Sequence, residues 1–197
     1  MKIGVAAMQG AVSEHVGAFR DALSASGRTG EVVEVRRPAD LRRVDALALP
    51  GGESTAISKL LVKFELVDDI IDRVEGGMPV MGTCAGCILL AKEGDFQVGG
   101  TGTRLLGLMD MSVSRNAFGR QRESFEAELK IDGLDGGPFH AVFIRAPAIL
   151  DAWGECRPLA TLETYIVAAR QDNLLALAFH PELTKDTRLH ELFISMI

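Results

Sequence analysis

One cysteine lies in a setting that could support nucleophilic chemistry. The segment Gly82-Thr83-Cys84-Ala85-Gly86 follows a short apolar run. Small residues on both sides allow the sharp strand-to-helix turn that exposes a nucleophile above a sheet. The N-terminus of the following helix favours the thiolate form, and the backbone N–H of Ala85 is placed to donate to an oxyanion. We therefore expect Cys84 to be a nucleophile, with a buried structural cysteine as the alternative.

The string Phe179-His180-Pro181-Glu182 could supply a base and the group that orients it. His180 can take the proton of a thiol and later return it to a leaving amine. Glu182 can accept a hydrogen bond from the other ring nitrogen and so set the tautomer and orientation of the imidazole. A single histidine at the end of a strand is more often structural, but its position downstream of a cysteine turn favours a Cys–His–Glu triad.

A third string, Pro50-Gly51-Gly52-Glu53-Ser54, follows a buried apolar run. Paired glycines at the carboxyl end of a strand let backbone N–H groups point into a site. We expect Gly52 and Ala85 to form an oxyanion hole, although this string alone is also typical of a plain strand-to-helix turn. The three strings together predict acyl transfer from an amide substrate.

The elements that must position these strings alternate between strand and helix in the first half of the chain. Apolar or alternating runs predict strands at residues 3–8, 31–36, 44–49 and 79–83. Helices are predicted at about 13–26, from about 54, before 76–77 and at 84–92. Ser13 is expected to cap the first helix and Gly27 to end it. This alternation favours a parallel, doubly wound sheet.

The second half of the chain predicts mainly strands, at residues 111–114, 123–131, 141–144, 165–170 and 174–179. Their short connections favour antiparallel pairing, so we expect a mixed sheet. A last helix is predicted at 186–197, and the glycine-rich stretch 94–107 is expected to be a mobile surface loop, since it lacks the ending of a phosphate-binding loop. The predicted fold class is α/β, a three-layer sandwich around a mixed, mostly parallel sheet, with residues 1–197 as a single domain.

Composition excludes several function classes. The chain has 197 residues, 47% of them hydrophobic, which is enough for one substantial core. A total of 21 Lys and Arg against 27 Asp and Glu disfavours nucleic acid and anionic membranes as partners. No apolar run approaches the roughly 20 residues that span a bilayer, and the first residues lack a signal-peptide pattern. Three cysteines do not suggest a disulfide framework, so we expect a cytoplasmic protein.

The three strings, G-T-C-A-G, P-G-G-E-S and F-H-P-E-L, resemble those of class I (triad) glutamine amidotransferases, which have a flavodoxin-like fold. Four further strings are similar to the glutaminase subunits of two-subunit pyridoxal 5'-phosphate synthases. They are M-Q-G-A-V with E-H at 8–12 and 14–15, R-N-A-F-G-R-Q at 115–121, S-F-E-A at 124–127 and F-I-R-A-P at 143–147. The second and fourth discriminate best, because other amidotransferases share the triad without them. The resemblance runs from Ile3 to the C-terminal helix.

This resemblance implies hydrolysis of L-glutamine to L-glutamate and ammonia through a thioester on Cys84. Ammonia would pass to a synthase subunit that builds pyridoxal 5'-phosphate from a pentose phosphate and a triose phosphate. The implied glutamine-binding residues are Gly52, Glu53, Ser54, Arg115, Ile144 and Arg145. A guanidinium suits the carboxylate of the substrate. Gln9 is a candidate for coupling to the partner, and no metal or cofactor is expected.

One residue departs from the family pattern. Cys87 stands where the family favours an aliphatic residue, and with Cys84 it makes a C-x-x-C spacing. A thioredoxin-like redox function would leave the H-P-E and P-G-G-E-S strings unexplained, so we expect Cys87 to pack in the core. The sequence also allows the glutaminase of a different amidotransferase or a non-catalytic regulatory subunit, although the intact triad disfavours the latter. His15, in the E-H string, has no role that the sequence reveals.

Overall fold

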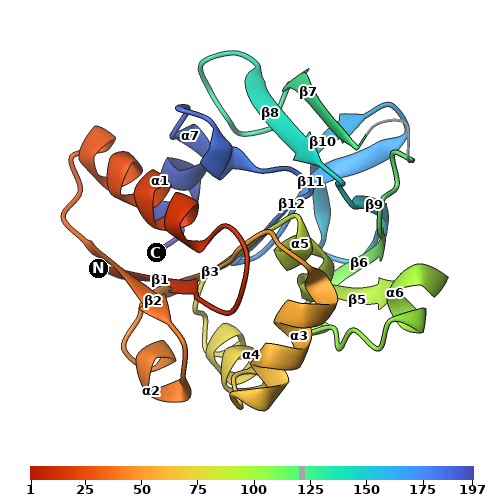
Figure 1. Cartoon of the computed structure of the whole chain (residues 1–197). Helices are drawn as coiled ribbons and strands as arrows, with labels where there is room; N and C mark the ends of the chain where they lie inside the picture. The colour runs from red at the N-terminus through yellow and green to blue at the C-terminus, as the bar shows by residue number, and fades with distance from the viewer. Residues whose placement is uncertain (120–122) are drawn as a thin grey trace.

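The computed structural model describes residues 1–119 and 123–197. They form a large mixed sheet with helices on both of its faces (Figure 1). The sheet strands are β1 (Lys2–Ala6), β2 (Glu31–Val35), β3 (Ala46–Leu49), β4 (Val80–Thr83), β5 (Ala91–Gly94), β6 (Met109–Ser114), β9 (Ala148–Ala152), β10 (Arg157–Leu162), β11 (Tyr165–Gln171) and β12 (Leu174–Leu177). Strands β7 (Ser124–Leu129) and β8 (Phe139–Ile144) form a separate antiparallel pair. The helices are α1 (Val12–Ala25), α2 (Pro38–Leu41), α3 (Ser54–Lys63), α4 (Val67–Glu75), α5 (Ala85–Leu90), α6 (Phe96–Gly100) and α7 (Arg188–Ile194), with one 3₁₀ turn, η1 (Pro181–Leu183).

The sheet changes from parallel to antiparallel pairing along its width. Its order is β2-β1-β3-β4-β12-β11-β9-β6-β5, with β10 also paired to β11. Strands β2 to β12 in this order are all parallel, whereas β11 runs antiparallel to β12. This arrangement confirms the predicted mixed sheet. It also brings the ends of β3, β4 and β12 to one edge of the sheet, where the carboxyl ends of parallel strands form ligand sites.

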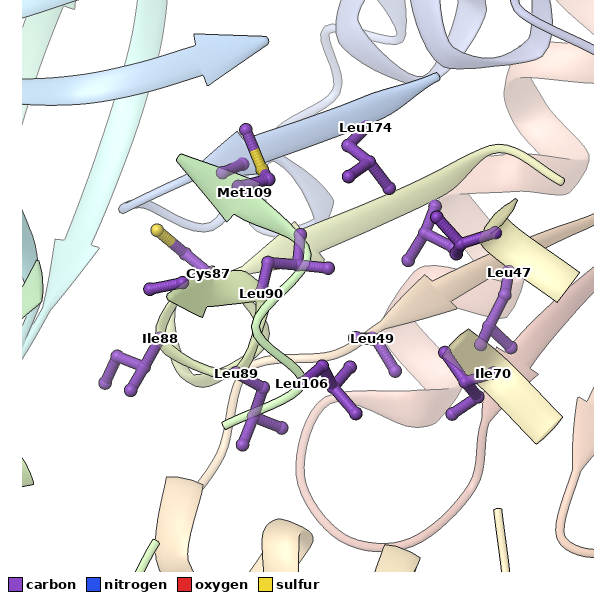
Figure 2. Close-up of a cluster of buried hydrophobic side chains, with 14 of the residues drawn as sticks. Leu47, Leu49, Ile70, Cys87, Ile88, Leu89, Leu90, Leu106, Met109 and Leu174 are labelled. Atoms are coloured by element: carbon purple, nitrogen blue, oxygen red, sulfur yellow. The ribbon is translucent and has the colours of Figure 1, made fainter. Parts of the chain in front are cut away.

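Hydrophobic cores cover both faces of the sheet. In β3, Leu47 and Leu49 belong to one core, whereas Ala46 and Ala48 belong to the other. The first core packs against α3, α4 and α5, and Figure 2 shows Leu47 and Leu49 with Ile70 of α4 and the side chains of α5. The second contains residues of α1, α7 and β8. Alternation of side chains along a strand therefore produces the predicted three layers.

The boundaries of α1 differ in part from the prediction. The residue before the helix is Ala11, whose side chain makes no capping hydrogen bond. Ser13 lies inside the first turn, and its hydroxyl donates a hydrogen bond to the carboxylate of Glu14. The expected cap by Ser13 is therefore wrong. The predicted end is confirmed, since Gly27 adopts φ +63° and its N–H donates to the carbonyl of Ser24 at 3.2 Å.

The middle of the chain contains elements that the sequence pattern did not predict. Helix α5 ends at Leu90, short of the predicted 92, because Ala91 begins β5 and pairs with Met109 of β6. The stretch 94–107, expected to be a surface loop, includes α6, which Asp95 caps by accepting from two backbone N–H groups. Strands β9 and β10 were also not predicted. Strands β5, β9 and β10 are defined by pairing with other strands and not by a local sequence pattern.

Cys87 of α5 is fully buried in the core, where Figure 2 shows it, so the prediction that it packs there is confirmed. Burial raises the pKa of its thiol far above the ordinary value. A thiol in this environment is a small apolar residue and not a ready nucleophile. Within residues 1–119 and 123–197, no helix is both long and apolar enough to cross a bilayer.

The contact between α5 and β3 predicts a specific effect on stability. A Cβ at Gly86 would lie 2.1 Å from the carbonyl oxygen of Leu49, and neither backbone can move without disturbing the sheet. Gly86→Ala should therefore lower the free energy of unfolding by about 1–3 kcal/mol, measured by urea denaturation. Gly17→Ala is the matched control, because Gly17 lies in α1 with nothing within 4 Å of the added Cβ. It should stabilise the protein by about 0.5–1 kcal/mol. An unchanged midpoint for Gly86→Ala would contradict the close approach.

Candidate active site

Cys84 occupies a strained turn between β4 and α5. Its backbone has φ 49° and ψ −103°, and its N–H donates to the carbonyl of Leu177 at 2.8 Å. A non-glycine residue with positive φ costs about 1–3 kcal/mol and persists only where its surroundings hold it. The glycines on either side are needed, because a Cβ at Gly82 would lie 2.5 Å from the carbonyl oxygen of Gly86. The turn therefore has the geometry expected of a nucleophile elbow.

His180 lies beside Cys84, three residues after the end of β12, which is one of the two strands that pair with β4. Its backbone N–H donates to the carbonyl of Val142 at 2.9 Å, which ties it to β8. Its Nδ1–H donates to Oε1 of Glu182 at 2.7 Å, and its ring and the side chain of Cys84 both border the backbone of Gly51. Burial lowers the pKa of His180, but Cys84 and Glu182 outweigh burial and raise it to about 10. The resting imidazole is therefore ready to hold a proton beside the thiol.

Glu182 completes this arrangement from the turn η1. Its carboxylate is buried, which by itself raises its pKa. The neighbouring rings of His15 and His180 and the hydrogen bond from His180 outweigh burial, so the pKa of Glu182 falls below its ordinary value. Its Oε2 lies 3.3 Å from Nε2 of His15. Glu182 is therefore an ionised carboxylate between two histidines, consistent with its predicted orienting role.

The loop after β3 packs directly against these residues. A Cβ at Gly51 would lie 2.4 Å from Cε1 of His180 and 3.3 Å from Cβ of Cys84. The carbonyl of Gly51 accepts from the N–H of Ala11 at 3.0 Å. Because N–H and C=O point in opposite directions across a trans peptide, the N–H of Gly52 is directed away from Ala11. Gly51 was not among the predicted residues, although its place in the G-G pair was the available signal.

The loop after β1, which contains Gln9 and Gly10, packs against the loop after β3 and hydrogen-bonds to it. The side-chain oxygen of Gln9 accepts from the backbone N–H of Glu53 at 2.8 Å. A Cβ at Gly10 would lie 1.8 Å from the carbonyl oxygen of Gly51, so only glycine fits there. Any displacement of the first loop must therefore move the second, which includes the predicted oxyanion residue Gly52.

Glu53 and Arg115 form the opposite wall. The carboxylate of Glu53 caps α3 by accepting from the N–H groups of Thr55 at 3.1 Å and Ala56 at 2.7 Å. Partial burial raises the pKa of Glu53, but these hydrogen bonds and the charge of Arg115 outweigh it and lower the pKa. Arg115 donates to Glu53 at 3.0 Å. In the described part of the chain, the buried hydroxyl of Ser54 has no hydrogen-bond partner, so it is available to a ligand.

The predicted residues meet in one pocket of about 380 Å³, within the ~300–1,000 Å³ typical of small-molecule sites. Those that line it are Gln9, Gly52, Glu53, Ser54, Cys84, Ala85, Arg115, Ile144, Arg145 and His180. Glu182 lies behind His180 and does not line it. The carbonyl oxygen of Ile144 is 4.0 Å from the sulfur of Cys84. Arg120 and Gln121 of the R-N-A-F-G-R-Q string lie outside the described residues.

Comparison with known proteins gives consistent matches. The model of the SNO glutamine amidotransferase family matches residues 5–197. The pyridoxal 5'-phosphate synthase subunit PdxT of Archaeoglobus fulgidus is 56% identical over 196 residues, covering 100% of this chain and 98% of the relative. PdxT of Methanosarcina barkeri is 52% identical over 197 residues, with coverage of 100% and 98%.

Solved structures agree in fold. The crystal structure of a glutamine amidotransferase at 45% identity has a TM-score of 0.86, covering 98% of this chain and 97% of that chain. A glutamine amidotransferase from Thermotoga maritima at 17% identity has a TM-score of 0.61, covering 99% and 83%. This second likeness concerns the fold alone.

The contact between Cys84 and His180 predicts how the thiol reacts. Iodoacetamide alkylates thiolates, so the imidazolium of His180 should promote alkylation near pH 7. His180→Gln should slow modification of Cys84 at pH 7 by about tenfold or more, and the difference should shrink above the ordinary thiol pKa of about 8.5. Mass spectrometry of the labelled peptide measures the rate. Cys84→Ala is the control, since the buried Cys87 should remain unlabelled, and identical rates for parent and His180→Gln across the pH range would contradict the pairing.

Proposed function

This chain belongs to the SNO glutamine amidotransferase family, and we propose that it is the glutaminase subunit of a pyridoxal 5'-phosphate synthase. It hydrolyses L-glutamine to L-glutamate and ammonia. The observation that carries this proposal is that Cys84 and His180 line one small-molecule pocket, while the ring of His180 donates to Glu182 behind it at 2.7 Å. Residues 1–197 act in this proposal as one glutaminase domain, since the pocket draws on both ends of the chain.

The first half of the reaction forms a thioester. The sulfur of Cys84 attacks the side-chain amide carbon of glutamine, and the carbonyl oxygen becomes an oxyanion that accepts from the N–H groups of Gly52 and Ala85. His180 gives its proton to the amide nitrogen as the C–N bond breaks, so ammonia leaves. Glu182 keeps the imidazole oriented and balances its charge while it holds the proton.

The second half restores the enzyme. His180 removes a proton from a water molecule, whose oxygen attacks the thioester carbon. The tetrahedral intermediate collapses with cleavage of the C–S bond, which releases glutamate. The sulfur of Cys84 leaves as a thiolate beside the reprotonated imidazole. Because the same histidine serves as acid and then as base, no further titrating group is needed.

Recognition of glutamine falls to the opposite wall of the pocket. Arg115 supplies a guanidinium for the substrate carboxylate, and the hydroxyl of Ser54, which has no partner among the described residues, supplies a further hydrogen bond. Glu53 holds Arg115 in place and adds negative charge near the ammonium of the substrate. Ile144 and Arg145 form the third side, with the carbonyl of Ile144 nearest to the nucleophile.

Ammonia passes in this proposal to a synthase subunit, which builds pyridoxal 5'-phosphate from a pentose phosphate and a triose phosphate. The support is that the relatives are named as subunits of that synthase. Gln9 is the candidate for coupling, because it holds the N–H of Glu53 and borders the pocket. Contact with the partner at Gln9 would act on Gly52 through a single loop.

Glutamine hydrolysis by the purified chain, alone and mixed with its synthase subunit, tests the function. Ammonia release should be slow alone and rise clearly on mixing, because assembly of the oxyanion hole by the partner would prevent wasteful hydrolysis. Cys84→Ala should abolish release while still binding the partner. A fast rate alone with no rise on mixing would contradict the coupling, and hydrolysis by Cys84→Ala would remove Cys84 from its role.

The role of Arg115 predicts a change in substrate affinity. Loss of a charge-assisted hydrogen bond costs about 1.5–3 kcal/mol, so Arg115→Gln should raise the KM for glutamine by about 10- to 100-fold. Steady-state kinetics of the mixed complex measures it. Arg104→Gln is the matched control, because Arg104 pairs with Asp68 on an exposed surface outside the pocket. Its KM should stay within about twofold of the parent, as expected for a surface ion pair. A similar KM for both variants would exclude Arg115 from substrate binding.

A further inference from the structure

We propose that His15 is a positioning residue of the triad, which holds the second carboxylate oxygen of Glu182 and thereby keeps the first one aimed at His180. This inference rests on the proposed glutaminase function, because it assigns a role within that site. It concerns a residue of α1 that does not line the pocket and that the sequence pattern left without a role.

The position of His15 joins both halves of the triad. Its ring is completely buried, and its Nε2 lies 2.9 Å from Oγ1 of Thr83 and 3.3 Å from Oε2 of Glu182. Thr83 immediately precedes Cys84, and Glu182 orients His180. Nε2 of His15 thus contacts both Thr83, at the end of β4 next to the nucleophile, and Glu182, the carboxylate that orients the base.

Glu182 needs a second contact of this kind. Its Oε1 accepts from His180, but its Oε2 is buried and makes no other hydrogen bond within the described residues that meets ordinary geometric criteria. A buried carboxylate oxygen without a donor is costly, and a carboxylate held at one oxygen only can rotate. Nε2 of His15 lies within ion-pair distance of that oxygen, so it is the group placed to restrain it.

The protonation state of His15 suits this role. Burial lowers its pKa, so the ring is neutral at physiological pH and one nitrogen carries the hydrogen. A hydrogen on Nε2 faces two oxygens, whereas a lone pair there would face the carboxylate and be repelled. In this arrangement the N–H donates to Thr83, and its partial positive charge lies 3.3 Å from Oε2 of Glu182. A neutral donor restrains Glu182 without placing a second positive charge near the imidazolium of His180.

A neighbouring histidine provides a matched comparison. His190 of α7 is also completely buried, and its ring centroid lies 5.7 Å from that of His15. Neither of its nitrogens has a hydrogen-bond partner within the described residues, and it packs edge-on against Phe19. Burial lowers its pKa to about 3. His190 thus shares the environment of His15 but makes no hydrogen bond to the triad.

The test compares these two histidines in the complex with the synthase subunit. His15→Leu should lower kcat for glutamine hydrolysis by about 10- to 100-fold, the size of effect seen when a residue that orients a metal-ligating side chain is removed. The KM should stay within about threefold of the parent. His15→Gln should recover most of kcat, because its amide can donate from a similar position. His190→Leu should stay within twofold of the parent. Equal kcat for parent and His15→Leu, or equal losses for the two leucine variants, would overturn the proposal.

A double-mutant cycle separates positioning from general loss of structure. If His15 acts through Glu182, adding His15→Leu to Glu182→Gln should change kcat by less than about threefold. Multiplied losses would overturn the proposal. His15→Phe, which keeps a ring among Phe19 and His190, replaces the leucine variant should that variant fail to fold.

An independent readout keeps failure of this inference distinct from failure of the proposed function. If the parent complex releases no ammonia from glutamine while Cys84 is intact, the glutaminase function fails. Alkylation of Cys84 by iodoacetamide at pH 7 still reports the reactivity of this thiol beside His180 in the full chain. His15→Leu should slow it severalfold and His190→Leu should not. Equal rates for His15→Leu and parent would overturn the role of His15 whatever the substrate.

Discussion

Close approach of backbone to backbone around Cys84 is the constraint on which the site depends. Three turns, after β1, β3 and β4, meet where a single Cβ would not fit. Gly86 lies against the carbonyl of Leu49, Gly10 against that of Gly51, and Gly51 against the ring of His180. Because glycine has no Cβ, these turns come near enough for His180, Cys84 and Gly52 to border one pocket. The spacing of the triad residues proposed here thus depends on backbone contacts.

Buried charge is the second constraint, and it links the triad to the rest of the molecule. A carboxylate as buried as that of Glu182 is tolerated only with compensating groups on both oxygens. His180 and His15 occupy those positions. On the opposite side of the pocket, the more exposed carboxylate of Glu53 is also stabilised by compensating groups. These are Arg115 and the backbone N–H groups at the N-terminus of α3. The pocket therefore has one ionic group at the reacting end and another where the substrate backbone would bind.

The departures from prediction share one cause, which is pairing between distant segments. Ala91 has good helical propensity, yet it begins β5 because Met109 offers a parallel strand partner. Ser13 is a strong capping residue, yet α1 starts one residue earlier, where the N–H of Ala11 binds the carbonyl of Gly51. In both places a tertiary hydrogen bond overrides a local preference. Strands β9 and β10 were overlooked for the same reason, since their partners define them.

The sequence by itself predicted a triad of Cys84, His180 and Glu182, because each of these roles imposes a local pattern of small or rigid neighbours. It also determined the mixed sheet, through its apolar runs and the lengths of their connections. Only the tertiary structure decided the contacts of His15 and Gly51 with the triad residues. His15 and Thr83 are 68 residues apart, and the hydrogen bond between them exists only because the fold brings α1 to the last residue of β4. Periodicity and spacing describe neighbours along the chain, whereas such contacts arise from the packing of layers.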